Sequence, residues 1–267
     1  MHRAGRRPGE GEIAGYVWIT PVLTYRADKG NISPASYRLQ NKHQVRMRLY
    51  LSSFDLGDRP EDLLTLAGEG RRAAIIVNAL DNRPDGRTRW LEDQTNKLTN
   101  LGFSVIELDL RHHFGVSSKL GAFLKDIDLV WVNGGNAFIL RRAMKQSGFD
   151  VLIKQAIARD EIVYAGFSAA AVITYSSLRG LEVVDDPEAV PVGYDPEIVW
   201  DGLGLLPYAV VVHFKSDHPE SELVEREIAF YEATGVPYRT LRDGEALIVR
   251  EGTLTRGRGE PQPGAED

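Results

Sequence analysis

Cysteine is absent from this sequence of 267 residues. Its absence excludes disulfides, thiolate metal sites and cysteine nucleophiles together, so any chemistry must use oxygen or nitrogen groups. Long apolar runs are missing too. None approaches the ~20 residues needed to cross a bilayer, and the N-terminus lacks the continuous apolar stretch of a secretory signal. We therefore expect a cytoplasmic protein that does not bind membranes.

Basic side chains are fewer than acidic ones, 32 against 38, which gives a net charge of -6. Phosphate binding requires a concentrated basic surface, so this balance argues against a nucleic-acid partner. The apolar content of 43% and the charged content of 26% are typical of a globular protein. The length favours one large α/β domain, which we expect to be a monomer or a homodimer.

The two ends of the chain differ in composition from the part between them. Residues 1–46 hold eight Lys and Arg against three acidic residues, so they form either a basic arm or an extension outside the domain. The apolar pattern that restarts at Met47 favours a disordered or non-domain extension. Residues 253–267 are predicted to be a disordered tail, because Gly, Pro and charge dominate there. The domain is therefore predicted to span residues 47–252.

Between these ends, short apolar segments alternate with segments of helical spacing. The predicted strands are Met47–Ser53, Ala73–Ala79, Phe103–Leu108, Leu129–Asn133 and Ile162–Phe167. The predicted helices are Thr88–Leu101, Ala137–Gln146, Phe149–Arg159 and Glu220–Ala233. This alternation predicts an α/β fold with three layers, in which an open, mostly parallel sheet is flanked by helices. Ligands of such sheets bind beyond the carboxyl ends of the strands.

A C-terminal hairpin is predicted near the end of the domain. Asp243-Gly244 lies between two apolar runs, Tyr238–Leu241 and Ala246–Arg250. Asp-Gly between apolar runs is a strong hairpin signal, so we expect the two runs to pair and to close one edge of the sheet.

Ser168 lies where a predicted strand runs through Gly166 into a series of alanines. Small residues beside a serine are typical of a nucleophile elbow, a tight strand-to-helix turn that exposes one hydroxyl above the sheet. The amides after Ser168 lie at a helix N-terminus, where they can meet an oxyanion. Serine is also a common helix N-cap, so this segment alone allows both interpretations.

Consecutive glycines, Gly134 and Gly135, follow the predicted strand that ends at Asn133. Their backbone amides suit a loop aimed at a ligand or an oxyanion, although a plain turn has the same composition. The G-x-G-x-x-G spacing of a dinucleotide site is missing.

His213 ends a further apolar run, Val210–His213. Imidazole is the usual base for a serine hydroxyl, although a strand-end histidine can also be structural. A carboxylate is then needed to orient the ring. Glu182, Asp185 and Asp186 all lie between the serine and the histidine, and they are either candidates for this role or part of a solvated loop.

Other histidines give weaker signals. His218 lies in a polar loop and is either a surface residue or a second histidine of the site. His112 and His113 are adjacent but lack an obvious third ligand, so we expect no metal site.

Taken together and in this order, these motifs resemble the peptidase E-like serine peptidases of peptidase family S51. The likeness covers roughly Met47 to Arg250 and includes Gly134-Gly135-Asn136 with Phe138, the Gly-x-Ser-Ala elbow, Gly202–Pro207 and His213. The resemblance implies a fold like that of class I glutamine amidotransferases, which is also flavodoxin-like.

The resemblance also implies roles for particular residues. Ser168 is the expected nucleophile, His213 the expected general base, and the backbone amides of Gly135 and Ala169 the expected oxyanion hole. Neither a metal nor an organic cofactor is implied.

Two positions depart from the family pattern. Ala170 stands where the elbow of the family has a glycine, and its methyl group would crowd either the helix–strand contact or the substrate. Val183 stands where the triad acid of the family falls. The role of the acid then passes to Asp186, with Asp185 or Glu182 as alternatives.

The expected activity is a serine peptidase that cleaves short peptides or related amides, in the manner of a dipeptidase, through an acyl-enzyme on Ser168. Arg226 is a poor match for the arginine that binds an aspartyl substrate, so aspartyl specificity is not expected. A glutamine amidotransferase would need a cysteine at the elbow. The alternative is a non-catalytic member of the same fold that binds a small molecule, which Ala170 and the displaced acid would allow.

Overall fold

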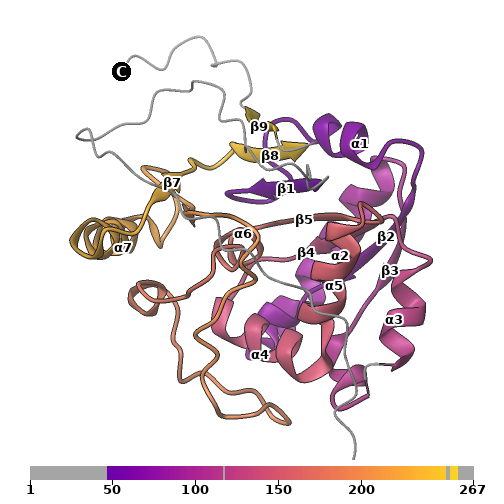
Figure 1. The fold of residues 1–267 in the computed structure, drawn as a ribbon, viewed down its shortest axis with the longest axis horizontal. Coiled ribbons are helices and arrows are strands. Elements are labelled where there is room, and N and C mark those ends of the chain that lie inside the picture. The colour runs from indigo at the N-terminus through magenta and orange to yellow at the C-terminus, as the bar shows by residue number, and fades with distance from the viewer. Residues whose placement is uncertain (1–46, 117, 251–252, 258–267) are drawn as a thin grey trace, which may run out of the picture. The chain divides into compact units, whose positions relative to one another are not determined.

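A seven-stranded sheet of order β3-β2-β4-β5-β1-β8-β9 forms the centre of the described part of the chain. Figure 1 shows it as a computed structural model, which describes residues 47–116, 118–250 and 253–257. The strands are β1 (Leu49–Ser52), β2 (Arg72–Ile76), β3 (Ser104–Glu107), β4 (Leu129–Val132), β5 (Val163–Phe167), β8 (Ala246–Arg250) and β9 (Thr253–Gly257). Strands β1 to β5 run parallel and β8 and β9 form an antiparallel edge, which confirms the predicted, mostly parallel sheet. The predictions for residues 1–46 and 258–267 lie outside the described residues.

The edge strand β3 is largely exposed, but the inner strands β1, β2, β4 and β5 are buried on both faces of the sheet. Successive side chains on a strand point to opposite faces. On β4, Val130 and Val132 pack into one apolar cluster, whereas Leu129 and Trp131 pack into another. All four side chains are fully buried. Burial on both sides explains why these strands read as continuous apolar runs rather than as alternating ones.

Helices cover each face of the sheet. On one face lie α1 (Glu61–Ala67) and α2 (Pro84–Asn100), and on the other α3 (Ser118–Leu124), α4 (Ala137–Ser147), α5 (Phe149–Ala158) and α6 (Ala169–Val172). Three 3₁₀ helices, η1 (Asn78–Leu80), η2 (Leu110–His113) and η3 (Leu181–Val183), lie in connections of the described chain. Helix α4 begins at Asn136, whose side chain accepts a hydrogen bond from the Ile139 amide, and it ends at Gly148 in the left-handed conformation. These capping residues explain why its bounds were predictable from the sequence.

A smaller parallel sheet pairs β6 (Ala209–Val211) with β7 (Tyr238–Thr240), and α7 (Ser221–Thr234) connects the two strands (Figure 1). The C-terminal hairpin is therefore formed by β8 and β9, and not by the two runs that flank Asp243-Gly244. That turn instead carries the chain from the small sheet to the large one. Gly244 packs so closely on Asp58 that a Cβ there would lie 2.5 Å from a carboxylate oxygen.

Strand β9 lies beyond the predicted domain boundary at residue 252. Thr253–Gly257 pairs with β8 along its whole length, from Arg250 opposite Thr253 to Ala246 opposite Gly257. Composition suggested a tail, but a partner strand supplies the backbone hydrogen bonds that order this segment. No helix among the described residues has the length and apolar character needed to span a membrane.

Candidate active site

Ser168 lies between β5 and α6 in a conformation that side chains rarely adopt, with φ 51° and ψ -111°. Its amide donates to the carbonyl of Ser52, and its own carbonyl accepts from Ala171 at the start of the helix. The hydroxyl makes no capping hydrogen bond to α6. A strained residue of this kind is typical of a nucleophile elbow and differs from an ordinary N-cap.

The elbow is compact because Gly166 makes room for Ala170. A Cβ at Gly166 would lie 2.1 Å from the Val132 carbonyl oxygen and 2.6 Å from the Ala170 Cβ. Ala170 is fully buried, and its carbonyl accepts a hydrogen bond from the Tyr164 hydroxyl. Its methyl group therefore packs at the helix–strand contact, and the chain accommodates it there.

The Gly134-Gly135 loop lies against the elbow. A Cβ at Gly134 would lie 3.0 Å from the Ser168 Cβ, and one at Gly135 would lie 2.6 Å from the Ala79 carbonyl oxygen. Gly135 has φ 133°, which favours glycine. Within the described residues, the amides of Gly135 and Ala169 donate to no other protein group. Two free amides near a nucleophile are what an oxyanion requires.

His213 connects the serine to a carboxylate. Its Nε2 lies 3.3 Å from the Ser168 Oγ, and its Nδ1 lies 2.7 Å from an oxygen of Asp243. The ring is 1% exposed. Because a carboxylate can only accept, Nδ1 is the donor in this pair, which leaves the Nε2 lone pair directed at the serine.

Ser53 supports both members of the His213–Asp243 pair. The Ser53 hydroxyl accepts a hydrogen bond from the His213 amide (2.8 Å) and donates to the Asp243 carboxylate (2.8 Å). Burial acts to raise the pKa of Asp243. The hydrogen bonds from His213 and Ser53, together with the charge that His213 carries once it is protonated, outweigh burial, so the pKa of Asp243 lies below its usual value. Asp243 is therefore ionised at neutral pH.

The acid beside His213 is thus Asp243, whereas the sequence pointed to Asp186. The Asp186 carboxylate accepts a hydrogen bond from the Glu188 amide, and the Asp186 carbonyl accepts one from Asn136. The first bond shapes a local turn, and the second ties this loop to the start of α4. Asp186 is placed to order this loop and does not orient the imidazole.

The two alternative acids also accept hydrogen bonds from backbone amides. Asp185 accepts from the Ala137 amide at the start of α4, and Glu182 accepts from the Gly180 amide. Burial raises the pKa of Asp185 to about 7, and the bond from Ala137 only partly offsets this effect. A carboxyl group that is partly protonated at neutral pH is poorly suited to hold an imidazolium.

Asp243 was missed because its turn was assigned to a hairpin. Strands β6 and β7 are parallel, with Val211 opposite Thr240, so their carboxyl ends lie side by side. His213 follows β6 and Asp243 follows β7. The signal available in the sequence was a strand–helix–strand unit around α7, which places both residues at the same edge.

His218 stacks on His213. The ring centroids lie 3.7 Å apart and the ring planes differ by 6°. Atoms of His213, His218 and Glu220 able to bind a metal lie within 4.8 Å of one another. The nitrogen lone pairs of two parallel rings lie in separate parallel planes, whereas the ligands of one ion converge on a point. This arrangement therefore favours ring stacking over metal binding.

A small pocket of ≈ 20 Å³ lies beside Ser168. Apolar side chains from α6, η3 and α7 line it together with the carboxyl groups of Asp185, Glu220 and Glu227. Glu227 is 2% exposed and accepts a hydrogen bond from the Tyr231 hydroxyl. Burial nevertheless raises the pKa of Glu227 to about 8. Two of the three carboxyl groups therefore hold protons near neutral pH, which limits the negative charge of the pocket.

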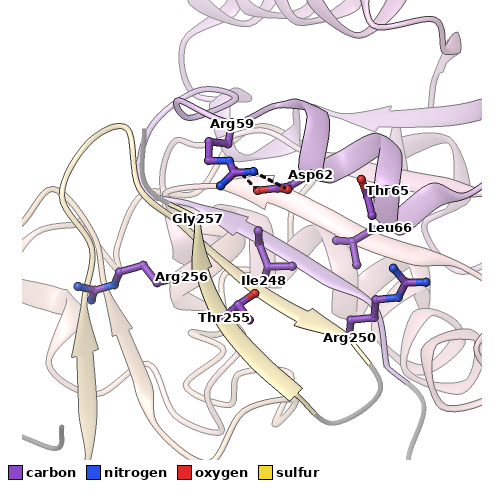
Figure 2. A pocket seen from close by; sticks show the side chains of 9 residues that line it. All are labelled: Arg59, Asp62, Thr65, Leu66, Ile248, Arg250, Thr255, Arg256 and Gly257. Atoms are coloured by element: carbon purple, nitrogen blue, oxygen red, sulfur yellow. Dashed lines mark hydrogen bonds and ion pairs between the residues drawn. The ribbon is translucent and has the colours of Figure 1, made fainter. Parts of the chain in front are cut away.

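A larger cavity of ≈ 400 Å³ lies between α1 and the β8–β9 hairpin (Figure 2). Arg59 and Asp62 form an ion pair at its rim, and Arg250 and Arg256 also line it. Its lining contains neither Ser168 nor His213. The larger cavity is therefore separate from the Ser168–His213–Asp243 cluster.

Comparisons with known proteins match this chain to peptidases. The family model for peptidase family S51 matches residues 63–257. The uncharacterized peptidase Lin0382 of Listeria innocua is 28% identical over 162 residues, which are 61% of this chain and 73% of that protein. Peptidase E of Citrobacter koseri is 31% identical over 209 residues, which are 74% of this chain and 82% of that protein.

Solved structures share the fold. One, described as a peptidase E protein from Listeria monocytogenes, has a TM-score of 0.66 at 23% identity and covers 80% of this chain and 100% of its own. This similarity confirms the expected class I glutamine amidotransferase-like fold. The family model spans most of the chain and reaches the end of β9. The chain belongs to peptidase family S51.

Proposed function

We propose that this protein is a serine peptidase that cleaves short peptides, in the manner of a dipeptidase, through an acyl-enzyme on Ser168. The observation that carries the proposal is the continuous chain of contacts from Asp243 through His213 to the Ser168 hydroxyl, at 2.7 Å and 3.3 Å. A base within hydrogen-bond reach of a nucleophile, itself oriented by a third group, is the arrangement that acyl transfer requires.

The proposed reaction has two halves. The Ser168 Oγ attacks the carbonyl carbon of the scissile amide while His213 Nε2 takes the hydroxyl proton. The resulting oxyanion accepts hydrogen bonds from the amides of Gly135 and Ala169. The imidazolium then gives its proton to the amine nitrogen as the C–N bond breaks. A water molecule, deprotonated by His213, attacks the acyl-enzyme and regenerates the serine.

The small pocket beside Ser168 supports a short substrate. Its ≈ 20 Å³ between α6, η3 and α7 holds little more than a water molecule, so this pocket offers no groove in which an extended chain could lie. The preference among short peptides depends on the protonation of Asp185 and Glu227, since both line the same space.

The test is hydrolysis of a dipeptide library by the purified protein and by the Ser168→Ala variant. We expect the variant to lose at least about a thousandfold in kcat/KM while its melting temperature stays near that of the wild type. Ser104→Ala, on the exposed edge strand β3, is the matched control and should retain full activity. Equal turnover by the Ser168→Ala variant and the wild type would overturn the proposal.

A further inference from the structure

Among the residues that the structure describes, His218 is the one histidine near the site that the proposed reaction does not use. Its ring covers one face of the His213 ring, with centroids 3.7 Å apart and planes within 6° of parallel. His213 reaches Ser168 through the edge of its ring, so the two contacts are made by different parts of the same imidazole.

The His218 ring is itself fixed in place. Its Nδ1 accepts a hydrogen bond from the backbone amide of Glu220 (3.2 Å). The Phe54 ring contacts His218 and His213 at centroid distances of 5.5 Å and 6.0 Å. Backbone and aromatic contacts therefore hold His218 independently of the serine.

The His213 imidazole needs such a support because Glu220 offers a competing acceptor once Nε2 carries a proton. A carboxylate oxygen of Glu220 lies 3.9 Å from that nitrogen, and the Ser168 Oγ lies 3.3 Å from it. Once the imidazole takes a proton, the carboxylate attracts it away from the serine and the leaving group. A rigid flat face against the ring resists this tilt.

We propose that His218 is a positioning residue, whose flat ring holds the His213 imidazole in the plane that faces Ser168. The proposal rests on the proposed function, because positioning matters only if His213 is the base. It assigns the role to the shape of the ring rather than to its proton.

The charges around His218 agree with a role for a neutral ring. Burial and the neighbouring His213 lower the pKa of His218, and the carboxylates of Glu220 and Asp243 only partly oppose them. His218 is therefore uncharged at neutral pH. A phenyl ring is then a fair substitute for its stacking face.

The test compares His218→Ala with His218→Phe, and uses His112→Ala on the exposed part of η2 as the control. We expect kcat of the alanine variant to fall about tenfold or more with KM within about twofold, since small misplacements of a base are costly. The phenylalanine variant should recover kcat to within about threefold of the wild type. The control should behave as the wild type does.

A second measurement needs no substrate. The His213 Nδ1 proton, hydrogen-bonded to Asp243, should give a downfield proton NMR signal in the wild type and in His218→Phe. The signal should broaden or vanish in His218→Ala. Wild-type kcat in His218→Ala, or equal losses in the alanine and phenylalanine variants, would overturn the proposal.

The two measurements separate this proposal from the proposed function. If the wild type hydrolyses nothing, the proposed function fails, yet the NMR comparison still reports whether His218 orders the His213 ring. If hydrolysis is normal and the NMR signal is the same in all variants, the positioning role alone fails.

Discussion

At the scale of single residues, the Asp243 carboxylate decides which nitrogen of His213 carries the proton. It accepts from Nδ1 at 2.7 Å, so Nε2 is left to accept from Ser168. The hydroxyl of Ser53 holds this carboxylate and the His213 amide in the same place. The pKa of Asp243 is lowered by these contacts despite burial, so the carboxylate stays charged when the imidazole takes a proton.

Replacement of Asp243 tests this role. In Asp243→Asn, an amide donor can face Nδ1, and the favoured tautomer then places the proton on Nε2. We expect kcat to fall by about a hundredfold to ten-thousandfold, with a small change in KM. Steady-state kinetics on the best dipeptide substrate measure the effect. Asp186→Asn is the matched control and should remain within about threefold of the wild type, and the opposite ranking would restore Asp186 as the acid.

Ser168 and His213 were predictable from the sequence because each stands at the end of an apolar run with a local signature. Asp243 has no such signature. Its position next to His213 arises from the parallel pairing of β6 with β7, in which Val211 lies opposite Thr240. Pairing between segments far apart in the chain is set by tertiary packing, which local patterns do not contain.

At the scale of elements, the strand-to-helix turn at Ser168 depends on a glycine, because no side chain fits at position 166. Gly166 lies against the neighbouring strand β4 and against α6, where a Cβ would meet the Val132 carbonyl oxygen at 2.1 Å. The methyl group of Ala170 occupies the space that this glycine leaves. The departure from a glycine at position 170 is therefore compatible with an intact elbow.

Two substitutions at the elbow should differ in their effects. Gly166→Ala should reduce the free energy of unfolding by about 3 kcal/mol, since the new methyl group would meet the Val132 backbone on one side and the buried Ala170 Cβ on the other. Ala170→Gly should cost only about 1 kcal/mol, because it adds backbone freedom to a helix, and it should keep near wild-type activity. Thermal unfolding and hydrolysis rates measure both. A strongly active and equally stable Gly166→Ala variant would contradict the packing described here.

The elements themselves were largely predictable from local patterns. Strands β1 to β5 follow runs of apolar residues, and helices α4, α5 and α7 follow apolar residues at helical spacing. Helices α4 and α7 end at Gly148 and Gly235. The strands that pair with β7 and β8 were not predictable. An Asp-Gly turn between apolar runs has the same sequence whether it closes a hairpin or connects two sheets. Strand β9 was not predicted, because its ordered structure depends on pairing with β8.

At the scale of the whole molecule, the fold buries carboxyl groups beside Ser168. Glu227 on α7 is 2% exposed, and burial raises its pKa to about 8. The unfolded chain releases this proton near the ordinary pKa of 4.5, whereas the folded protein keeps it. Stability is therefore lost as the pH rises from about 4.5 to about 8, and the loss is complete above that range.

Glu227→Gln should remove this pH dependence. The variant keeps an acceptor for the Tyr231 hydroxyl but has no proton to lose. We expect its free energy of unfolding to exceed that of the wild type by an amount that grows with pH, by at most about 1.4 kcal/mol per pH unit within that window. Urea unfolding at pH 5, 7 and 9 measures the difference. Glu225→Gln, exposed on the same helix, controls for the loss of one charge, and a difference that is constant with pH would refute the assignment.

The central claim is that Asp243, His213 and Ser168 act as one unit that makes the serine nucleophilic. Its most direct measurement is the rate of covalent labelling by a fluorophosphonate probe, with the modified residue located by peptide mass spectrometry. The account predicts that the wild type is labelled at Ser168, and that labelling slows by at least about a hundredfold in His213→Ala and in Asp243→Asn. Labelling at another residue, or equal rates in all three proteins, would contradict it.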